Sequence, residues 1–198
     1  MQSAVEKKKS ENAVYGDIIS LPDDKRWEII NGRVYDMTPA PSSFHQKVLG
    51  NLYRIVADFL DGKSCEVYFS PFDVRLPEND EPDEEIASVV QPDLTVICDK
   101  KKIDKKGCRG APDWIVEILS PFTRKKDLLE KTLLYEKHKV KEYWIIYPDE
   151  KFIQVYELEN TNSGKEEYVQ KRVYIGNAKV PVKVLAGLKI DMHKIFRE

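Results

Sequence analysis

Two carboxylates lie in stretches that otherwise have the pattern of buried β-strands. Glu117 lies in the run Trp114–Leu119, where apolar residues occupy both faces of an extended chain. Asp93 follows Pro92 and precedes the run 94–97, in which only Thr95 is not apolar. A carboxylate in such surroundings needs a cation, a hydrogen-bond network or a metal ion. Because sequential strands often pair, Asp93 and Glu117 are expected to meet as an oxygen-rich site suited to Mg²⁺ or Mn²⁺.

Each carboxylate also has an interpretation without chemistry. Glu117 could lie on an edge strand or form a structural salt bridge. Asp93 could be the polar end of a strand, because Pro92 removes a donor from the ladder and favours an edge or a bulge just before it. Spacing alone does not decide between these interpretations and the metal site.

A predicted helix over about 123–139 adds a cation. At about 100° per residue one face carries Lys131, and its companions on that face are Arg124, Asp127, Leu128, Leu134, Tyr135 and His138. Lys131 is therefore expected to turn toward the sheet. It could instead extend past Leu128 and Leu134 to water, or pair with Asp127 one turn earlier.

The opposite side of this helix carries Leu129 and Leu133. Two leucines facing away from the predicted sheet need another cover, either the C-terminal segment or a second subunit. With the strand edges expected in the C-terminal region, they predict a homodimer.

The elements that must position these residues follow the order α-β-β-β-α-β. A helix over 45–60 has apolar residues at helical spacing. Strands are expected over 65–76, 89–98, 113–119 and 142–147, with the helix at 123–139 before the last strand. The fold class is α/β (α+β), with this core spanning 45–148.

A β-hairpin over 25–40, turning at Asn31-Gly32, precedes the core. Short strand candidates over 151–198 follow it, and residues 1–15 are polar and expected to be mobile. Without an internal repeat or a second core, residues 1–198 are predicted to form a single domain.

Three further residues have uncertain roles. Glu28 alternates with Trp27 and Ile29 in the hairpin and could be a third carboxylate of the site or a surface residue. His45 lies at a helix start and could be functional or structural. Asp73 could pair with Arg75 in the same short run.

Composition narrows the class of protein. The chain has 41% hydrophobic residues and a net charge of -2, so it has enough apolar residues for a core and lacks the basic balance of a protein that coats nucleic acid. The start has no apolar stretch of a signal peptide, and no run approaches the roughly 20 apolar residues that span a bilayer. A cytoplasmic protein is therefore expected.

Cysteines and motifs exclude several chemistries. Cys65, Cys98 and Cys108 have no CxxC spacing, so reduced thiols are expected rather than a disulfide framework or a zinc knuckle. Motifs of nucleotide-binding loops, zinc proteases and serine hydrolases are absent from the sequence.

These residues resemble the Uma2 family, also called DUF820, which is described as restriction-endonuclease-like. The resemblance runs from about residue 25 to the end. It is carried by WEIINGRVYDM, HQKVLGNLYRIV, FDVRL, VVQPDLTVI, GAPDWIVEILSP, TRKKDLLEKTLLYEKHKVKEYWIIYP and LAGLKID.

The resemblance implies the PD-(D/E)XK nuclease core. Pro92-Asp93 then takes the place of the PD half-motif and Glu117 the acidic place of (D/E)XK. Leu119 stands where the lysine is expected, which is a departure, and Lys131 would reach the site from the helix instead. Glu28 looks like the additional acid of the hairpin, and His45 matches a histidine common in the family.

The function implied is Mg²⁺- or Mn²⁺-dependent hydrolysis of DNA phosphodiester bonds. Asp93, Glu117 and Glu28 would hold the metal ion, and Lys131 would orient water or stabilise the phosphate. Contacts to flanking phosphates are expected from Arg109, Lys125 and Lys126. Two alternatives remain, a non-catalytic module on a nuclease fold that binds nucleic acid or protein, and a hydrolase of smaller phosphate esters.

Overall fold

The computed structural model describes residues 12–19, 26–37, 40–120, 126–161 and 164–197. Its main sheet has six strands in the order β12-β11-β10-β9-β6-β3. Their bounds are β3 Glu66–Phe69, β6 Leu94–Ile97, β9 Trp114–Ile118, β10 Glu142–Tyr147, β11 Phe152–Asn160 and β12 Glu166–Ile175. Strands β9 and β10 run parallel, and the other neighbours in this sheet are antiparallel.

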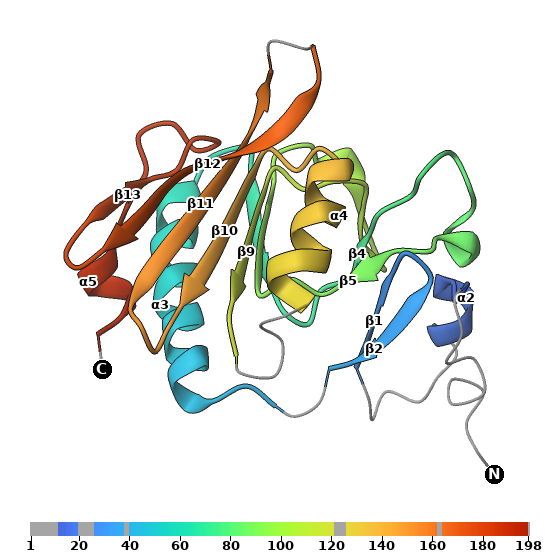
Figure 1. Cartoon of the computed structure of the whole chain (residues 1–198), viewed down its shortest axis with the longest axis horizontal. Coiled ribbons are helices and arrows are strands. Elements are labelled where there is room, and N and C mark those ends of the chain that lie inside the picture. Colours follow the sequence, from blue (N-terminus) through green and yellow to red (C-terminus); the bar gives the residue numbers. More distant parts are fainter. Residues whose placement is uncertain (1–11, 20–25, 38–39, 121–125, 162–163, 198) are drawn as a thin grey trace.

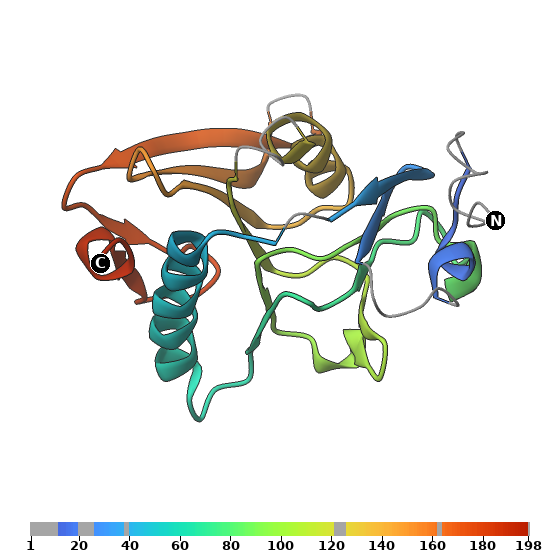
Figure 2. The same cartoon turned by 90° about the horizontal axis from the view of Figure 1, so that it is seen from below.

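Helices cover both faces of this sheet (Figures 1 and 2). Helix α3, Ser43–Leu60, packs on one face, and its start is capped by Ser42, whose hydroxyl accepts from the His45 amide. On the other face lies a helical segment with π-helical hydrogen bonding over Lys126–Lys131, here η3, which continues as α4, Thr132–Lys137. The order α3-β3-β6-β9-α4-β10 is the α-β-β-β-α-β order expected from the sequence.

The two faces of β9 enter different hydrophobic clusters. Trp114, Val116 and Ile118 pack on the side of α3, and Ile115 and Leu119 pack on the side of α4. Both faces are therefore apolar, as predicted, and Glu117 shares the α4 side. The C-terminal elements β13 Lys179–Pro181, β14 Lys189–Asp191 and α5 Met192–Ile195 complete the cluster beside α3.

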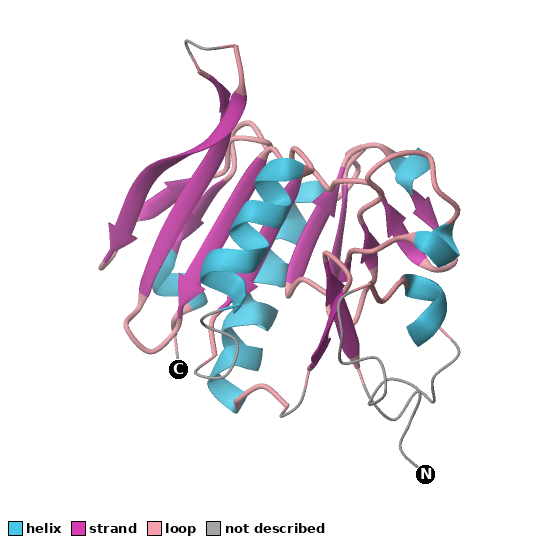
Figure 3. Ribbon diagram, turned by 45° about the vertical axis from the view of Figure 1, so that its right-hand side comes forward, coloured by secondary structure: helices cyan, strands magenta, loops and turns pink. Residues whose placement is uncertain are grey.

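A second sheet has the order β2-β1-β5-β4-β8-β7. Its strands are β1 Trp27–Ile30, β2 Arg33–Asp36, β4 Val74–Arg75, β5 Val89–Val90, β7 Ile103–Asp104 and β8 Gly107–Arg109. The predicted hairpin is present: Asn31 and Gly32 both adopt positive φ between β1 and β2, as a tight hairpin turn requires. Short helices α2 Tyr15–Ile18, η1 Asp83–Glu85 and η2 Lys100–Lys102 border this sheet (Figure 3).

Two predicted strands each prove to be two strands in different sheets. The run 65–76 divides at Ser70-Pro71 into β3 and β4, and the run 89–98 divides at Pro92 into β5 and β6. Proline cannot donate to a strand ladder, so both interruptions fall where the chain leaves one sheet for the other. The passage from one sheet to the other therefore occurs just before Asp93.

The expectation of reduced cysteines is wrong, and the expectation of a mobile N-terminus does not hold for its described residues, 12–15. Cys65 and Cys98 form a disulfide, because the β3–β6 register sets Glu66 opposite Ile97 and so brings the flanking cysteines together. Cys108 alone is a free, buried thiol. At the N-terminus, Ala13 and Tyr15 are buried, and the amides of Asn12 and Ala13 donate to the Gly32 carbonyl, so this part of the predicted mobile tail is packed.

No helix in the described ranges is long and apolar enough to cross a membrane.

Candidate active site at the junction of the two sheets

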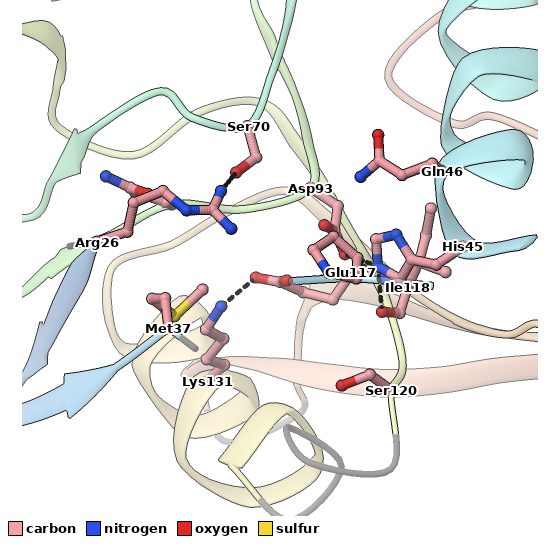
Figure 4. A pocket seen from close by; sticks show the side chains of 12 residues that line it. Arg26, Met37, His45, Gln46, Ser70, Asp93, Glu117, Ile118, Ser120 and Lys131 are labelled. Carbon is pink, nitrogen blue, oxygen red and sulfur yellow. Dashed lines mark hydrogen bonds and ion pairs between the residues drawn. The ribbon is translucent and has the colours of Figure 1, made fainter. Parts of the chain in front are cut away.

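A pocket of about 70 Å³ opens where the start of α3, the loop before β6, the end of β9 and the η3 segment meet (Figure 4). Its lining residues come from β9, from segments that flank strands of both sheets, and from both covering helices. They are Arg26, Met37, Pro41, His45, Gln46, Ser70, Gln91, Asp93, Glu117, Ile118, Ser120 and Lys131.

Asp93 and Glu117 are brought together by strand register. Leu94 pairs with Val116 across the antiparallel β6–β9 ladder, so one step further Asp93 comes opposite Glu117. The Oδ2 atom of Asp93 accepts the Ile118 amide at 2.7 Å, which continues the ladder through a side chain after Pro92 has interrupted it. Both carboxylates line the same pocket.

Lys131 is buried between two carboxylates. Its Nζ lies 2.8 Å from Glu117 Oε1 and 2.8 Å from Glu28 Oε1, and only 1% of its side chain is exposed. It turns toward the sheet, as predicted, and does not extend to water. The alternative partner, Asp127, has its side chain outside the described part of the structure.

Tyr135 completes the surroundings of Glu117. One turn after Lys131, its hydroxyl donates to Glu117 Oε1 at 2.7 Å. Burial, followed by the charges of Glu117 and Glu28, raises the pKa of Tyr135 well above its usual value, so the phenol stays protonated and remains a donor. Helical spacing in the sequence places Tyr135 on the same face as Lys131 but does not indicate its contact with Glu117.

Glu28 is fully buried on β1, in the second sheet. Its Oε1 accepts the Gln91 amide at 2.9 Å as well as the Lys131 ammonium. Glu28 is not among the residues that line the pocket. Its contacts link the second sheet to the helix that covers the main sheet.

His45 packs in the first turn of α3 with 5% of its surface exposed. Its Nε2 lies 2.9 Å from the Ile118 carbonyl oxygen and 3.2 Å from Asp93 Oδ2. Both neighbours are acceptors, so Nε2 must carry the proton. His45 thereby holds the end of β9 and the carboxylate of Asp93 in place.

The pocket also contains residues that sequence analysis did not select. Arg26 lies just before β1, and its Nη1 donates to Ser70 Oγ at 3.2 Å. The signal was present in the sequence: Arg26 and Glu28 are two residues apart in an extended chain and therefore share a face. Gln46 and Ser70 provide further polar groups at the pocket wall.

Other sequence predictions lie away from the pocket or outside the described residues. Asp73 does not pair with Arg75: its carboxylate accepts from Tyr15 and Gln91, and Arg75 pairs with Asp83 and Asp104. Arg109 donates to Asp83 and to the Glu81 carbonyl. The side chains of Lys125 and Lys126 are not described, so their expected phosphate contacts stay predictions.

The donor chemistry of the pocket fits a magnesium ion that keeps part of its water. In the described part of the chain, no three His, Cys, Asp or Glu side chains surround one point as a closed metal cage would require. Mg²⁺ commonly binds through one or two carboxylates, with waters and substrate phosphates as its other ligands. Asp93 and Glu117 supply such a pair, and the cavity has room for a hydrated ion.

The position where the (D/E)XK motif has its lysine holds a residue of the hydrophobic core. Leu119, two residues after Glu117, is 5% exposed and packs with Ile115 and Leu134. The cation of the site comes from the helix instead, through Lys131. The position two residues after Glu117 therefore holds no cation, and the cation beside Glu117 lies on a different element.

The fold is that of the restriction-endonuclease-like nucleases. A solved structure described as a "putative nuclease belonging to DUF820 from Anabaena variabilis ATCC 29413" superposes with a TM-score of 0.69 at 20% identity, over 91% of this chain and 95% of that chain. Residues 15–193 match the model of Uma2, described as "Putative restriction endonuclease", and the chain therefore belongs to the Uma2 family. No curated protein matches the chain.

Proposed function

We propose that this protein is a metal-dependent endonuclease that hydrolyses phosphodiester bonds in DNA. The observation that carries the proposal is the pairing of Asp93 and Glu117 in one pocket, with the Lys131 ammonium 2.8 Å from Glu117. Membership of a family described as restriction endonucleases supports the same chemistry.

The contacts in the pocket suggest a separate role for each residue. Asp93 and Glu117 would hold Mg²⁺ or Mn²⁺, which when bound supplies Lewis-acid polarisation of a phosphate and lowers the pKa of water. The Ile118 amide and His45 fix the Asp93 carboxylate. Lys131 orients Glu117 through their direct contact, and its ammonium at the pocket wall can orient a water molecule or stabilise negative charge.

Glu28 receives a different role from the ligand role suggested by the family resemblance. Because it is buried behind Lys131 and does not line the pocket, it is better suited to positioning the ammonium than to holding a metal ion. Tyr135 has a similar task at Glu117. Metal binding by this site would then rest on Asp93 and Glu117.

The test is cleavage of supercoiled plasmid, linear duplex and single-stranded DNA with Mg²⁺, with Mn²⁺ and with EDTA. The native protein should cleave at least one substrate only when the divalent ion is present. Glu117→Gln preserves shape but removes the charge and should abolish cleavage. Cleavage that persists in the variant or in EDTA would place the chemistry elsewhere.

The alternative is a nuclease fold used for binding nucleic acid or protein without turnover. The observation that favours it is Leu119, which is packed in the core where the motif has its lysine. Binding of labelled DNA without any product, with either metal and over the three substrates, would favour this alternative.

We also propose that the protein forms a homodimer. Leu129 and Leu133 are 57% and 67% exposed on the outer side of the η3–α4 helix, and the edge strand β12 exposes Val173 and Ile175. A second copy that covers the leucines would remove this apolar surface from water. Light scattering should show a dimer, and Leu133→Glu should yield monomers; a monomeric native protein at high concentration would contradict the proposal.

A further inference from the structure

Two cations line the pocket, and their surroundings differ. Lys131 is enclosed by Glu28 and Glu117, so its positive charge is already balanced. Arg26 is only partly buried, and its side-chain contact within the described residues is the Ser70 hydroxyl, a neutral group. Figure 4 shows the Arg26 guanidinium turned into the pocket on the side opposite His45. Arg26 is therefore the cation at this site with binding capacity left for a ligand.

We propose that Arg26 binds a phosphate oxyanion of the substrate. The inference rests on the proposed function and adds the residue that receives the anion. A guanidinium offers five N–H donors in a planar fork that matches two phosphate oxygens. Ser70 accepts from one nitrogen and so restrains the side chain, which leaves the other donors for the ligand.

An anionic substrate needs such a group here. Asp93 and Glu117 give the pocket negative charge, and the Lys131 ammonium is shared between two acids. A phosphate that approached these carboxylates without a cation of its own would be repelled. Arg26 on the opposite wall supplies the attraction, and the acids remain available for a divalent ion.

The assignment separates the tasks of the two cations. Lys131 is held in ion pairs with Glu117 and Glu28, so its loss should change stability as well as cleavage. Arg26 acts on the substrate, so its loss should weaken binding and leave the fold intact. The chemistry recognised is a phosphate ester, which DNA and smaller phosphate esters share.

The experiment measures binding without turnover. A fluorescently labelled DNA duplex is titrated with native protein, Arg26→Met, Arg26→Lys and the control Arg54→Met, once in EDTA and once with Ca²⁺ to neutralise the carboxylates. Arg54 is exposed on α3, outside the pocket, so its substitution removes the same charge from the surface. Inorganic phosphate is titrated in parallel and followed by ³¹P line broadening.

Arg26→Met should lower the affinity for DNA and for inorganic phosphate by about tenfold or more, which is the effect expected from the loss of a charge-assisted hydrogen bond. Arg26→Lys should lie between, because it keeps the charge but loses the fork, and Arg54→Met should change affinity by less than about twofold. Melting temperatures equal to the native value show that all variants are folded. If Arg26→Met melts at a lower temperature than the native protein, the comparison rests on Arg26→Lys and the native protein.

The outcomes distinguish this inference from the proposed function. If native protein and Arg26→Met bind DNA with equal affinity and both cleave it, the inference about Arg26 is overturned. The proposed nuclease function is then unaffected. Arg26-dependent binding of phosphate without any binding of DNA would support the inference and remove DNA as the substrate. If the native protein binds neither ligand under either condition, both proposals fail.

Discussion

Glu117 and Glu142 are buried acids on the neighbouring parallel strands β9 and β10, and the protein treats them differently. Glu117 faces the side of α4, where it meets the ammonium of Lys131 and the hydroxyl of Tyr135. Glu142 faces the side of α3, where it accepts from the Trp144 indole at 2.7 Å and the Val184 amide at 2.9 Å, both neutral donors.

The surroundings of Glu142 change its pKa. Burial, the largest cause, raises the pKa of Glu142 to about 7, with the charge of Glu157 adding to it and the hydrogen bonds from Val184 and Trp144 opposing it. A buried acid without a cation can thus approach neutrality, whereas an acid that must stay charged for metal binding needs a partner such as Lys131. Burial of a carboxylate alone does not mark a functional site; a cationic partner beside a pocket does.

The largest effect should come from Lys131→Met. It leaves Glu28 and Glu117 buried without their cation, and breaking a buried ion pair in this way costs about 3–5 kcal/mol. Urea unfolding should show this loss in the free energy of unfolding, together with the absence of cleavage. The apolar stem that Met preserves does not compensate for two buried acids left without their cation.

The matched control for Lys131→Met is Lys137→Met on the same helix, where an exposed pair with Glu78 is worth about 1 kcal/mol or less. Adding Glu28→Gln to Lys131→Met should restore part of the stability without restoring cleavage. If Lys131→Met is as stable as the native protein, the ion network is not what holds this junction.

Glu142→Gln should change how the free energy of unfolding depends on pH. Because the folded-state pKa of Glu142 is above the unfolded value of 4.5, the folded state binds more protons between pH 4.5 and about 7. The contribution of Glu142 protonation to the free energy of unfolding is therefore fully present below pH 4.5. It is lost as the pH rises to about 7 and above. Gln resembles the protonated acid, so the variant's stability relative to the native protein should rise by about 3 kcal/mol over that interval.

Unfolding free energies of native and Glu142→Gln protein at pH 4.5, 6 and 8 measure this difference. Cleavage should be unchanged, since Glu142 lies outside the pocket. A difference that does not vary with pH would show that the carboxylate of Glu142 is charged in the folded core.

Metal binding should stabilise the protein through Asp93. The paired carboxylates of Asp93 and Glu117 repel each other, and Mg²⁺ or Mn²⁺ relieves that repulsion. At a metal concentration 100 times Kd the gain is about 2.7 kcal/mol, visible as a higher Tm. Asp93→Asn should abolish the gain, and Asp58→Asn on the exposed side of α3 should retain it. Equal shifts in all three proteins would locate the ion away from this pair.

The smallest effect should come from Tyr135→Phe. It removes one donor to Glu117 while the Lys131 contact remains, so the expected loss is about 1 kcal/mol in the free energy of unfolding. Chemical denaturation measures it. A loss as large as that of Lys131→Met would mean that the phenol, rather than the ammonium, dominates the surroundings of Glu117.

The sequence predicted most of the core because its signals are local. Periodicity located α3, Asn31-Gly32 located the hairpin, and Pro92 indicated the interruption before Asp93. The meeting of Asp93 and Glu117 followed from the expectation that sequential strands pair.

What the sequence could not supply was the contact between distant segments. A helical wheel shows that Lys131 faces the sheet, but Glu28 reaches it only because β1 belongs to a second sheet that borders the pocket. The exchange of sheets at Pro71 and the Cys65–Cys98 disulfide depend on register in the same way. Arg26 was missed because the surroundings of the hairpin start were unknown.

The contact of Glu28 with Lys131 connects two sheets that are expected to differ in stability. The main sheet has strands of up to ten residues, whereas β4, β5 and β7 have two residues each. Few ladder bonds favour sub-global opening, in which one region exchanges its amide hydrogens while the rest stays protected. Under mild denaturant the second sheet would detach first and carry Glu28 and Arg26 with it. The site would then be dismantled while β9 and β10 remained folded, so inactivation would precede unfolding.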